Sequence, residues 1–180
     1  MVLLFLAEGF EEIEALTPVD ILRRGGVELL TVGVGGNTIK GSHGIYVAAD
    51  IEDKQLGDLS DVEAVILPGG MPGTLNLEKN STVINTVKYC AEKDLVIGAI
   101  CAAPSILGHL GLLEGRRAVC YPSFEGELKG AVGCSEYVCR DGKIITAKGM
   151  GVSVDFGLEL LSALRGQAAA DKVRASIQCR

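Results

Sequence analysis

The sequence predicts an α/β protein whose doubly wound, mainly parallel sheet carries helices on both faces. Short apolar runs alternate along the chain with longer segments of helical periodicity, and this alternation is typical of βαβ units. The runs are apolar throughout, as expected for strands buried on both faces of a sheet. The length of 180 residues suits one domain, so we expect residues 1–180 to share a single core.

Four of the apolar runs predict buried strands, because each is short and is bounded by charged or turn residues. They cover residues 2–7, 27–34, 64–67 and 95–100. Two further runs, residues 137–140 and 143–147, flank Asp141-Gly142 and predict a hairpin. Between residues 37 and 50, glycines and alternating apolar positions predict a small hairpin or an edge strand.

Helical spacing predicts helices over residues 12–24, 83–93, 103–110 and 152–164. Gly25-Gly26 marks the end of the first helix. Pro18 leaves two alternatives open. If it lies inside this helix, it removes the hydrogen bond to the carbonyl of Glu14 and loosens the first turn; if the helix begins later, it occupies the first turn, where proline is harmless.

The net charge of −6 makes nucleic acid and anionic membranes improbable partners, since no positive field would attract their phosphates. The first residues, Met1 to Ala7, meet Glu8 at once and lack a basic flank. This segment is too short for a signal or membrane helix. We therefore expect a buried first strand and a cytoplasmic protein.

The cysteines and histidines argue against a metal centre in the sequence. Six cysteines without a secretory signal indicate free thiols, and no pair has C-x-x-C spacing. Only His43 and His109 could add nitrogen ligands, so a tetrahedral zinc site would need distant cysteines. The glycines of residues 33–36 lack the full dinucleotide spacing. We expect no metal and no cofactor.

Cys101 stands where a predicted strand turns into a predicted helix, and Pro104 suits the first helical turn. This is the pattern of a nucleophile elbow, whose nucleophile has small neighbours two residues away on either side. Here these are Ala99 and Ala103. The helix N-terminus should favour the thiolate, so we expect Cys101 to be the most acidic thiol. The alternative, an inert buried cysteine, is the common case for an arbitrary thiol.

Two further motifs lie at the ends of predicted strands. The run Pro68-Gly69-Gly70 could direct backbone N–H groups into a shared concavity that suits an oxyanion. Acidic residues follow the first strand, at the sheet edge where open α/β sheets bind ligands. Most of them suit a helix N-terminus, but one that is buried near the thiol would favour its protonated form and could move protons. They are Glu8, Glu11, Glu12 and Glu14.

Taken together, three motifs resemble the ThiJ/PfpI superfamily, in its branch of the parkinsonism-associated deglycase, often called DJ-one. The motifs are Gly98-Ala99-Ile100-Cys101-Ala102-Ala103-Pro104, Leu67-Pro68-Gly69-Gly70, and Glu11-Glu12-Ile13-Glu14 with Pro18-Val19-Asp20. The resemblance covers essentially the whole chain. It implies a flavodoxin-like fold, a homodimer, and a reactive Cys101 hydrogen-bonded to a protonated Glu14.

The resemblance also assigns further site residues. The family's oxyanion donors fall on the backbone N–H groups of Gly70 and Ala102, and we expect Gly69 and Tyr121 to contact substrate. One departure concerns Tyr121-Pro122, where this branch often has histidine before proline. A mechanism that needs this histidine is therefore in doubt.

The resemblance implies a cysteine-dependent, cofactor-independent glyoxalase or deglycase, a lyase or hydrolase acting on methylglyoxal, glyoxal or their early protein adducts. A second class of function uses the same thiol. It is a redox-sensing protein of the oxidative stress response or a holdase chaperone, with Cys101 oxidised to sulfinic acid. An intracellular cysteine protease is disfavoured, because Ala102 occupies the position at which such relatives carry histidine.

Overall fold

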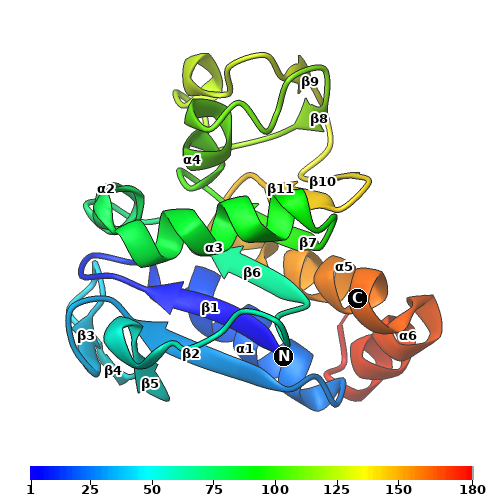
Figure 1. The fold of residues 1–180 in the computed structure, drawn as a ribbon. Coiled ribbons are helices and arrows are strands. Elements are labelled where there is room, and N and C mark those ends of the chain that lie inside the picture. The colour runs from blue at the N-terminus through cyan, green and yellow to red at the C-terminus, as the bar shows by residue number, and fades with distance from the viewer. Residues whose placement is uncertain (180) are drawn as a thin grey trace.

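The computed structural model describes residues 1–179, which fold around a central seven-stranded sheet (Figure 1). The strands are β1 (Val2–Leu6), β2 (Leu29–Gly33), β3 (Thr38–Lys40), β4 (Tyr46–Ala48), β5 (Ile51–Glu52), β6 (Ala64–Leu67), β7 (Val96–Ile100), β8 (Arg117–Ala118), β9 (Val132–Gly133), β10 (Val138–Asp141) and β11 (Ile144–Ala147). The helices are α1 (Glu12–Arg24), α2 (Gly73–Lys79), α3 (Ser81–Glu92), α4 (Pro104–His109), α5 (Ser153–Arg165) and α6 (Gln167–Ser176).

The large sheet has the strand order β10-β11-β7-β6-β1-β2-β5. Its pairs are parallel except for the β10–β11 hairpin, which turns at Asp141-Gly142 as predicted. This is the predicted doubly wound, flavodoxin-like arrangement, and the four predicted buried strands form its centre as β2, β1, β6 and β7. The predicted hairpin between residues 37 and 50 is the separate β3–β4 pair.

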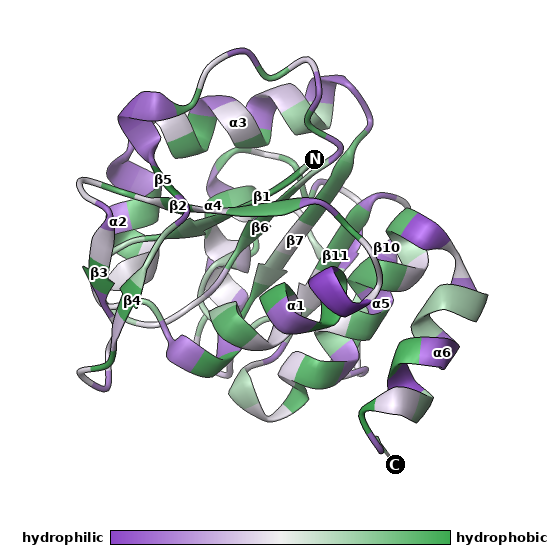
Figure 2. Cartoon of the chain, turned by 90° about the horizontal axis from the view of Figure 1, so that it is seen from below, coloured by the Kyte–Doolittle hydropathy of each residue, from purple (hydrophilic) through white to green (hydrophobic). Residues whose placement is uncertain are grey.

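Two hydrophobic cores lie on opposite faces of the sheet, because successive side chains of a strand point to opposite sides. In β1, Leu4 and Leu6 belong to the core covered by α1, α5 and α6, whereas Leu3 and Phe5 belong to the core covered by α2, α3 and α4. Figure 2 shows α1 and α5 across one face and the hydrophobic colouring of the central strands. The central strands β1, β6, β7 and β11 are therefore buried on both faces.

Pro18 lies inside α1, which begins at Glu12, so the alternative of a later helix start is wrong. α1 packs closely on α5, where a Cβ added to Gly157 would lie 2.8 Å from Cδ1 of Ile21. The absence of a side chain at Gly157 therefore allows α1 and α5 to approach closely.

The sequence analysis did not find α2, α6, β5 or the β8–β9 pair. α2 has seven residues, and β5, β8 and β9 have two each, which is too short to establish a periodicity. α6 has ten residues, and its polar sequence has only two buried side chains, Ala170 and Val173.

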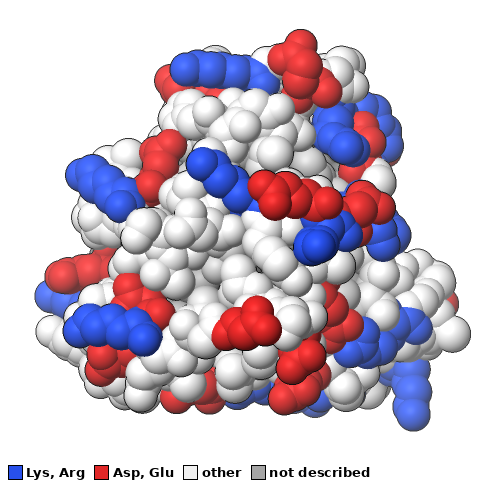
Figure 3. Space-filling view, in the orientation of Figure 1, with Lys and Arg blue, Asp and Glu red and all other residues white. Residues whose placement is uncertain are grey.

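The surface carries both signs of charge. On the face shown in Figure 3, basic and acidic side chains lie beside one another. Within residues 1–179, no helix combines the length and the apolar character needed to cross a bilayer.

Candidate active site

The candidate site lies at the carboxyl ends of β1, β6 and β7, which are neighbours in the sheet. From β1 the chain continues to β2 on one side, and β6, β7, β11 and β10 extend the sheet on the other side. Ligands of open α/β sheets bind at such a switch point. The predicted acidic, glycine-rich and cysteine motifs follow these three strands and therefore meet at this edge.

Cys101 occupies a strained elbow between β7 and α4. Its φ of 65° lies in the left-handed region, which costs a residue other than glycine about 1–3 kcal/mol. The surrounding backbone holds it there: the Cys101 N–H donates to the carbonyl of Ala147 at 2.9 Å, and its own carbonyl accepts from the N–H of Tyr121 at 2.8 Å. Ala99 and Ala103 are completely buried, as the tight turn requires.

Glu14 reaches the thiol from the first turns of α1. Its side chain is hydrogen-bonded to the Cys101 side chain. One carboxyl oxygen, Oε2, accepts the N–H of Gly69 at 3.0 Å, and the N–H of Met150 is also directed at the carboxyl. The residue is 1% exposed. The carboxyl is therefore buried and fixed against the sulfur.

Two backbone N–H groups interact with the Cys101 sulfur. They belong to Gly70 and Ala102, the two residues predicted to hold an oxyanion. Gly70 has φ of 91°, and an added Cβ would collide with the backbone nitrogen of Glu11. Only glycine fits this position. Fixed N–H donors of this kind can stabilise negative charge on sulfur or on an oxygen bonded beside it.

Burial raises the pKa of Glu14 to about 7, and the negative charge of Glu11 acts in the same direction. The hydrogen bonds from Cys101, Gly69 and Met150 oppose this shift because they stabilise the carboxylate. A carboxyl with a pKa near neutrality can both accept and return a proton at physiological pH.

The expectation that Cys101 is the most acidic thiol is wrong for this arrangement. Burial raises its pKa to about 12, and the charge and hydrogen bond of Glu14 add to the effect. The N–H groups of Gly70 and Ala102 lower the pKa but do not outweigh burial. The following helix has only six residues. The resting sulfur is therefore a thiol, and its proton has to be removed by a neighbour.

The two residues expected to contact substrate have different surroundings. Gly69 lies between the reacting groups, since an added Cβ would be 2.6 Å from both Cys101 Cβ and Glu14 Oε2. Tyr121 is 51% exposed and lines a cavity of about 460 Å³ with Tyr137, Gly149 and Met150. The cavity adjoins the site, because an added Cβ on Gly149 would lie 3.8 Å from Glu14 Oε1.

The sequence analysis missed the segment Gly149-Met150, which supplies an N–H to Glu14 and a wall of the cavity. Its only sequence signal was its place after the predicted strand 143–147, which ends at the same sheet edge. The other histidine that the sequence analysis named, besides His43, is His109. It lies at the exposed end of α4, where it contacts Glu78 and Glu127.

Residues 1–163 match the DJ-1/PfpI family. The chain belongs to that family. Protein DJ-1 homolog A of Arabidopsis thaliana is 35% identical over 99% of this chain, although the match spans 46% of the Arabidopsis protein. Protein dj-1beta of Drosophila melanogaster is 30% identical over 95% of this chain and 92% of its own length. Thus the chain spans about half the length of the Arabidopsis relative and nearly all of the Drosophila relative.

The chain is also similar to solved structures of DJ-1 proteins and to a relative that is named as an enzyme. Oxidized DJ-1 of Toxoplasma gondii has a TM-score of 0.94 and 30% identity, and the match covers 99% of this chain and 97% of that chain. A Caenorhabditis elegans relative, 29% identical over 88% of this chain and 85% of its own length, is named glutathione-independent glyoxalase DJR-1.2. The DJ-1/PfpI family therefore has the flavodoxin-like fold seen here and includes glyoxalase-type enzymes.

Proposed function

We propose that this protein is a cofactor-independent glyoxalase or deglycase that uses Cys101 as its nucleophile. The proposed substrates are small dicarbonyls such as methylglyoxal and glyoxal, and the early adducts they form with protein amines and thiols. The observation that supports this proposal most strongly is that the Cys101 sulfur interacts with a carboxyl whose pKa is about 7 and with two backbone N–H donors. The glyoxalase name of the C. elegans relative supports the same class of reaction.

In the first step, the Glu14 carboxylate removes the thiol proton as Cys101 Sγ attacks the aldehyde carbon of methylglyoxal. A carbon–sulfur bond forms, and the carbonyl π electrons move to oxygen. The N–H groups of Gly70 and Ala102 stabilise the resulting oxyanion, which then takes the former thiol proton back from Glu14 to give a hemithioacetal and to restore the Glu14 carboxylate. The raised pKa of the thiol makes this proton transfer necessary.

In the second step, Glu14 moves the proton of the former aldehyde carbon to the oxygen of the adjacent carbonyl group, which gives an enediol. Glu14 then takes the proton of the hydroxyl on the first carbon and delivers a proton to the second carbon, which completes the isomerisation. The first carbon is oxidised to a thioester and the second is reduced to an alcohol, so no external oxidant or reductant is needed. Water then cleaves the thioester, which releases lactate and restores the Cys101 thiol. Tyr121 and the adjoining cavity would accommodate larger groups attached to the dicarbonyl.

The direct test follows methylglyoxal loss and lactate appearance with dialysed protein in the presence of chelator and without glutathione or nicotinamide. We expect many equivalents of lactate per chain. Loss of one dicarbonyl per reactive side chain without lactate would identify simple scavenging and would overturn the proposal.

The same donors favour a second candidate, a redox sensor or holdase chaperone. Two molecules of hydrogen peroxide would oxidise the Cys101 thiol to sulfinic acid with release of two waters, and the N–H groups of Gly70 and Ala102 would bind its oxygens. Mass mapping after peroxide treatment, combined with the lactate assay, separates the candidates. A protein that accumulates sulfinic acid at Cys101 but forms no lactate is a sensor.

We also propose that the protein is a homodimer, as the family resemblance implies. Ile13 and Leu16 expose apolar side chains on α1, at 45% and 36%, and burial in an interface would remove them from water. Light scattering at micromolar concentration should give twice the chain mass of 18.8 kDa. A single species at the mass of one chain would contradict the dimer.

A further inference from the structure

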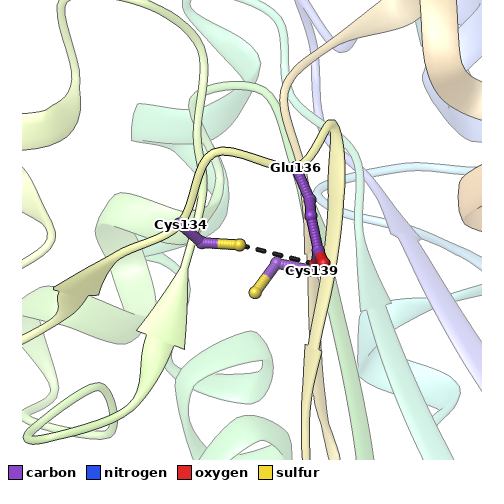
Figure 4. Close-up of side chains that lie close together, drawn as sticks. All are labelled: Cys134, Glu136 and Cys139. Carbon is purple, nitrogen blue, oxygen red and sulfur yellow. Dashed lines mark hydrogen bonds between the residues drawn. The ribbon is translucent and has the colours of Figure 1, made fainter.

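A second group of reactive side chains lies away from the Cys101 site, between β9 and β10. Cys134 follows β9, Glu136 lies in the connecting loop, and Cys139 is the second residue of β10. Their sulfur and carboxylate ligand atoms all lie within 4.8 Å of one another. Figure 4 shows the three side chains converging from the loop and the strand. Four residues lie between the two cysteines, so no C-x-x-C motif marks them.

The loop is held in a shape that keeps these donors together. The Cys134 thiol donates to Glu136 Oε2 at 3.5 Å. The Lys148 backbone N–H donates to the Tyr137 carbonyl at 2.9 Å, and its ammonium group donates to the Ser135 carbonyl at 3.4 Å. Lys148 also lies over the Tyr137 ring, 4.7 Å from its centroid. Both ends of the loop are thus tied to the chain after β11.

We propose that Cys134, Glu136 and Cys139 form a binding site for a thiophilic divalent cation of the zinc class. Two thiolates and one carboxylate are a donor set that zinc uses, with a fourth position left for water. Zinc–sulfur bonds of about 2.3 Å place two sulfurs of a tetrahedron roughly 3.8 Å apart. Donors already within 4.8 Å therefore need to move by only about 1 Å.

Space and charge at the cluster agree with a cation. Cys134 lines a cavity of about 180 Å³, which leaves room for an ion and its water beside the sulfur. Binding would release two thiol protons and leave two thiolates, one carboxylate and a divalent ion, with a net charge of −1. Lys148, which lines the same cavity, would offset this charge.

The participation of Glu136 distinguishes a metal site from a simple disulfide. A disulfide would use the two sulfurs and leave the carboxylate without a role, whereas a cation needs it as third ligand. The ion would tie the loop to β10 and thereby stabilise Tyr137, which lines the cavity beside the Cys101 site.

The test titrates Co²⁺, a spectroscopic substitute for Zn²⁺, into the full chain after phosphine reduction and removal of metal. We expect one Co²⁺ per chain, sulfur-to-cobalt charge-transfer absorption with tetrahedral d–d bands, and loss of both on adding Zn²⁺. Zn²⁺ should also raise the melting temperature, because it binds only the folded loop.

Variants assign the ligands. Cys134→Ser and Cys139→Ala should abolish the tetrahedral cobalt spectrum, and Glu136→Gln should weaken Co²⁺ binding at least roughly tenfold. Cys179→Ser, a matched change of another half-buried thiol, and Cys101→Ala should leave it intact. Cys134 and Glu136 reach the surface, so their variants test the site even if Cys139→Ala fails to fold.

Three results would overturn the site. The first is the absence of cobalt charge transfer in the reduced protein. The second is a spectrum that survives Cys134→Ser or disappears in Cys101→Ala. The third is mass mapping that finds Cys134 and Cys139 joined in a disulfide in protein whose reduced form binds no Co²⁺. The binding readout is independent of dicarbonyl turnover, so failure of either proposal leaves the other testable.

Discussion

Cys90 and Cys101 have thiols with the same raised pKa, about 12, but they lie in different surroundings. Cys90 lies on the buried side of α3 among apolar side chains, and burial alone raises its pKa. Around Cys101, burial is joined by a carboxyl and two N–H donors. A raised thiol pKa therefore reports burial in both regions. The arrangement of partners is what distinguishes a candidate nucleophile from a core cysteine.

Replacing each of the two cysteines in turn tests this distinction most strongly. Cys101→Ser should abolish methylglyoxal turnover, because a hydroxyl is a much weaker nucleophile than the thiolate that forms when Glu14 removes the thiol proton. Cys90→Ala is the matched control. It should retain turnover and lower the free energy of unfolding by about 1 kcal/mol, the cost of a small cavity.

The measurements are lactate formation and denaturant unfolding on both variants. The comparison fails if Cys101→Ser keeps the wild-type rate, or if Cys90→Ala loses turnover while it remains folded.

Replacement of the carboxyl beside the sulfur is expected to have the next largest effect. Glu14→Gln keeps the shape of the side chain but cannot accept the thiol proton, so kcat should fall by about 10²–10⁴-fold. Glu12→Gln is a useful control on the same helix, since Glu12 contacts His43 and the backbone around it. Steady-state kinetics on the folded variants gives the comparison. Equal rates in Glu14→Gln and the wild type would remove Glu14 from the mechanism.

Much of this arrangement could be predicted from the sequence, because it follows from strand ends. The central strands are apolar and short, so their order along the chain located the segments around Glu14, Gly70 and Cys101 at one edge of the sheet. A protonated Glu14 was expected, but the raised pKa of the Cys101 thiol could not be predicted this way. It depends on how deeply the elbow is buried and on the shortness of α4, and both are properties of packing.

The Cys134 and Cys139 cluster shows the same limit. The two thiols meet because β9 belongs to a small sheet whose strands have only two residues each, and the loop before β10 folds back on Lys148. No periodicity marks such short elements. The sequence analysis consequently set metal binding aside.

Glu14 should also make folding stability depend on pH, which Cys90 cannot do in the same range. Its pKa rises from 4.5 to about 7 on folding, so between these values the native state binds more protons than the unfolded state. The free energy of unfolding should then fall by about 3 kcal/mol as pH rises from 4.5 to 7. The contribution is fully present below the unfolded pKa.

The measurement compares urea unfolding of wild type and Glu14→Gln at several pH values in this window. Other titrating groups act on both proteins, so the difference between the two curves isolates Glu14. A difference that does not change with pH would show that Glu14 is not buried as a protonated acid.

The smallest expected effect comes from changing the distance between the Cys101 thiol and the Glu14 carboxyl while both groups remain present. It tests whether this distance distinguishes the Cys101 site from the surroundings of Cys90. Gly69→Ala adds one methyl carbon that would lie 2.6 Å from both Cys101 Cβ and Glu14 Oε2, so thiol and carboxyl must move apart while both remain present. A misplacement of about 1 Å can cost about a hundredfold in rate, and we expect a loss of kcat of that order. Gly57→Ala is the control, because an added Cβ there meets nothing within 4 Å; it should retain the wild-type kcat. Lactate kinetics measures the rates, and circular dichroism verifies that both variants are folded. If folded Gly69→Ala turns over as fast as Gly57→Ala, the close contact between sulfur and carboxyl is not needed, and the distinction drawn between the two cysteines rests on the thiol alone.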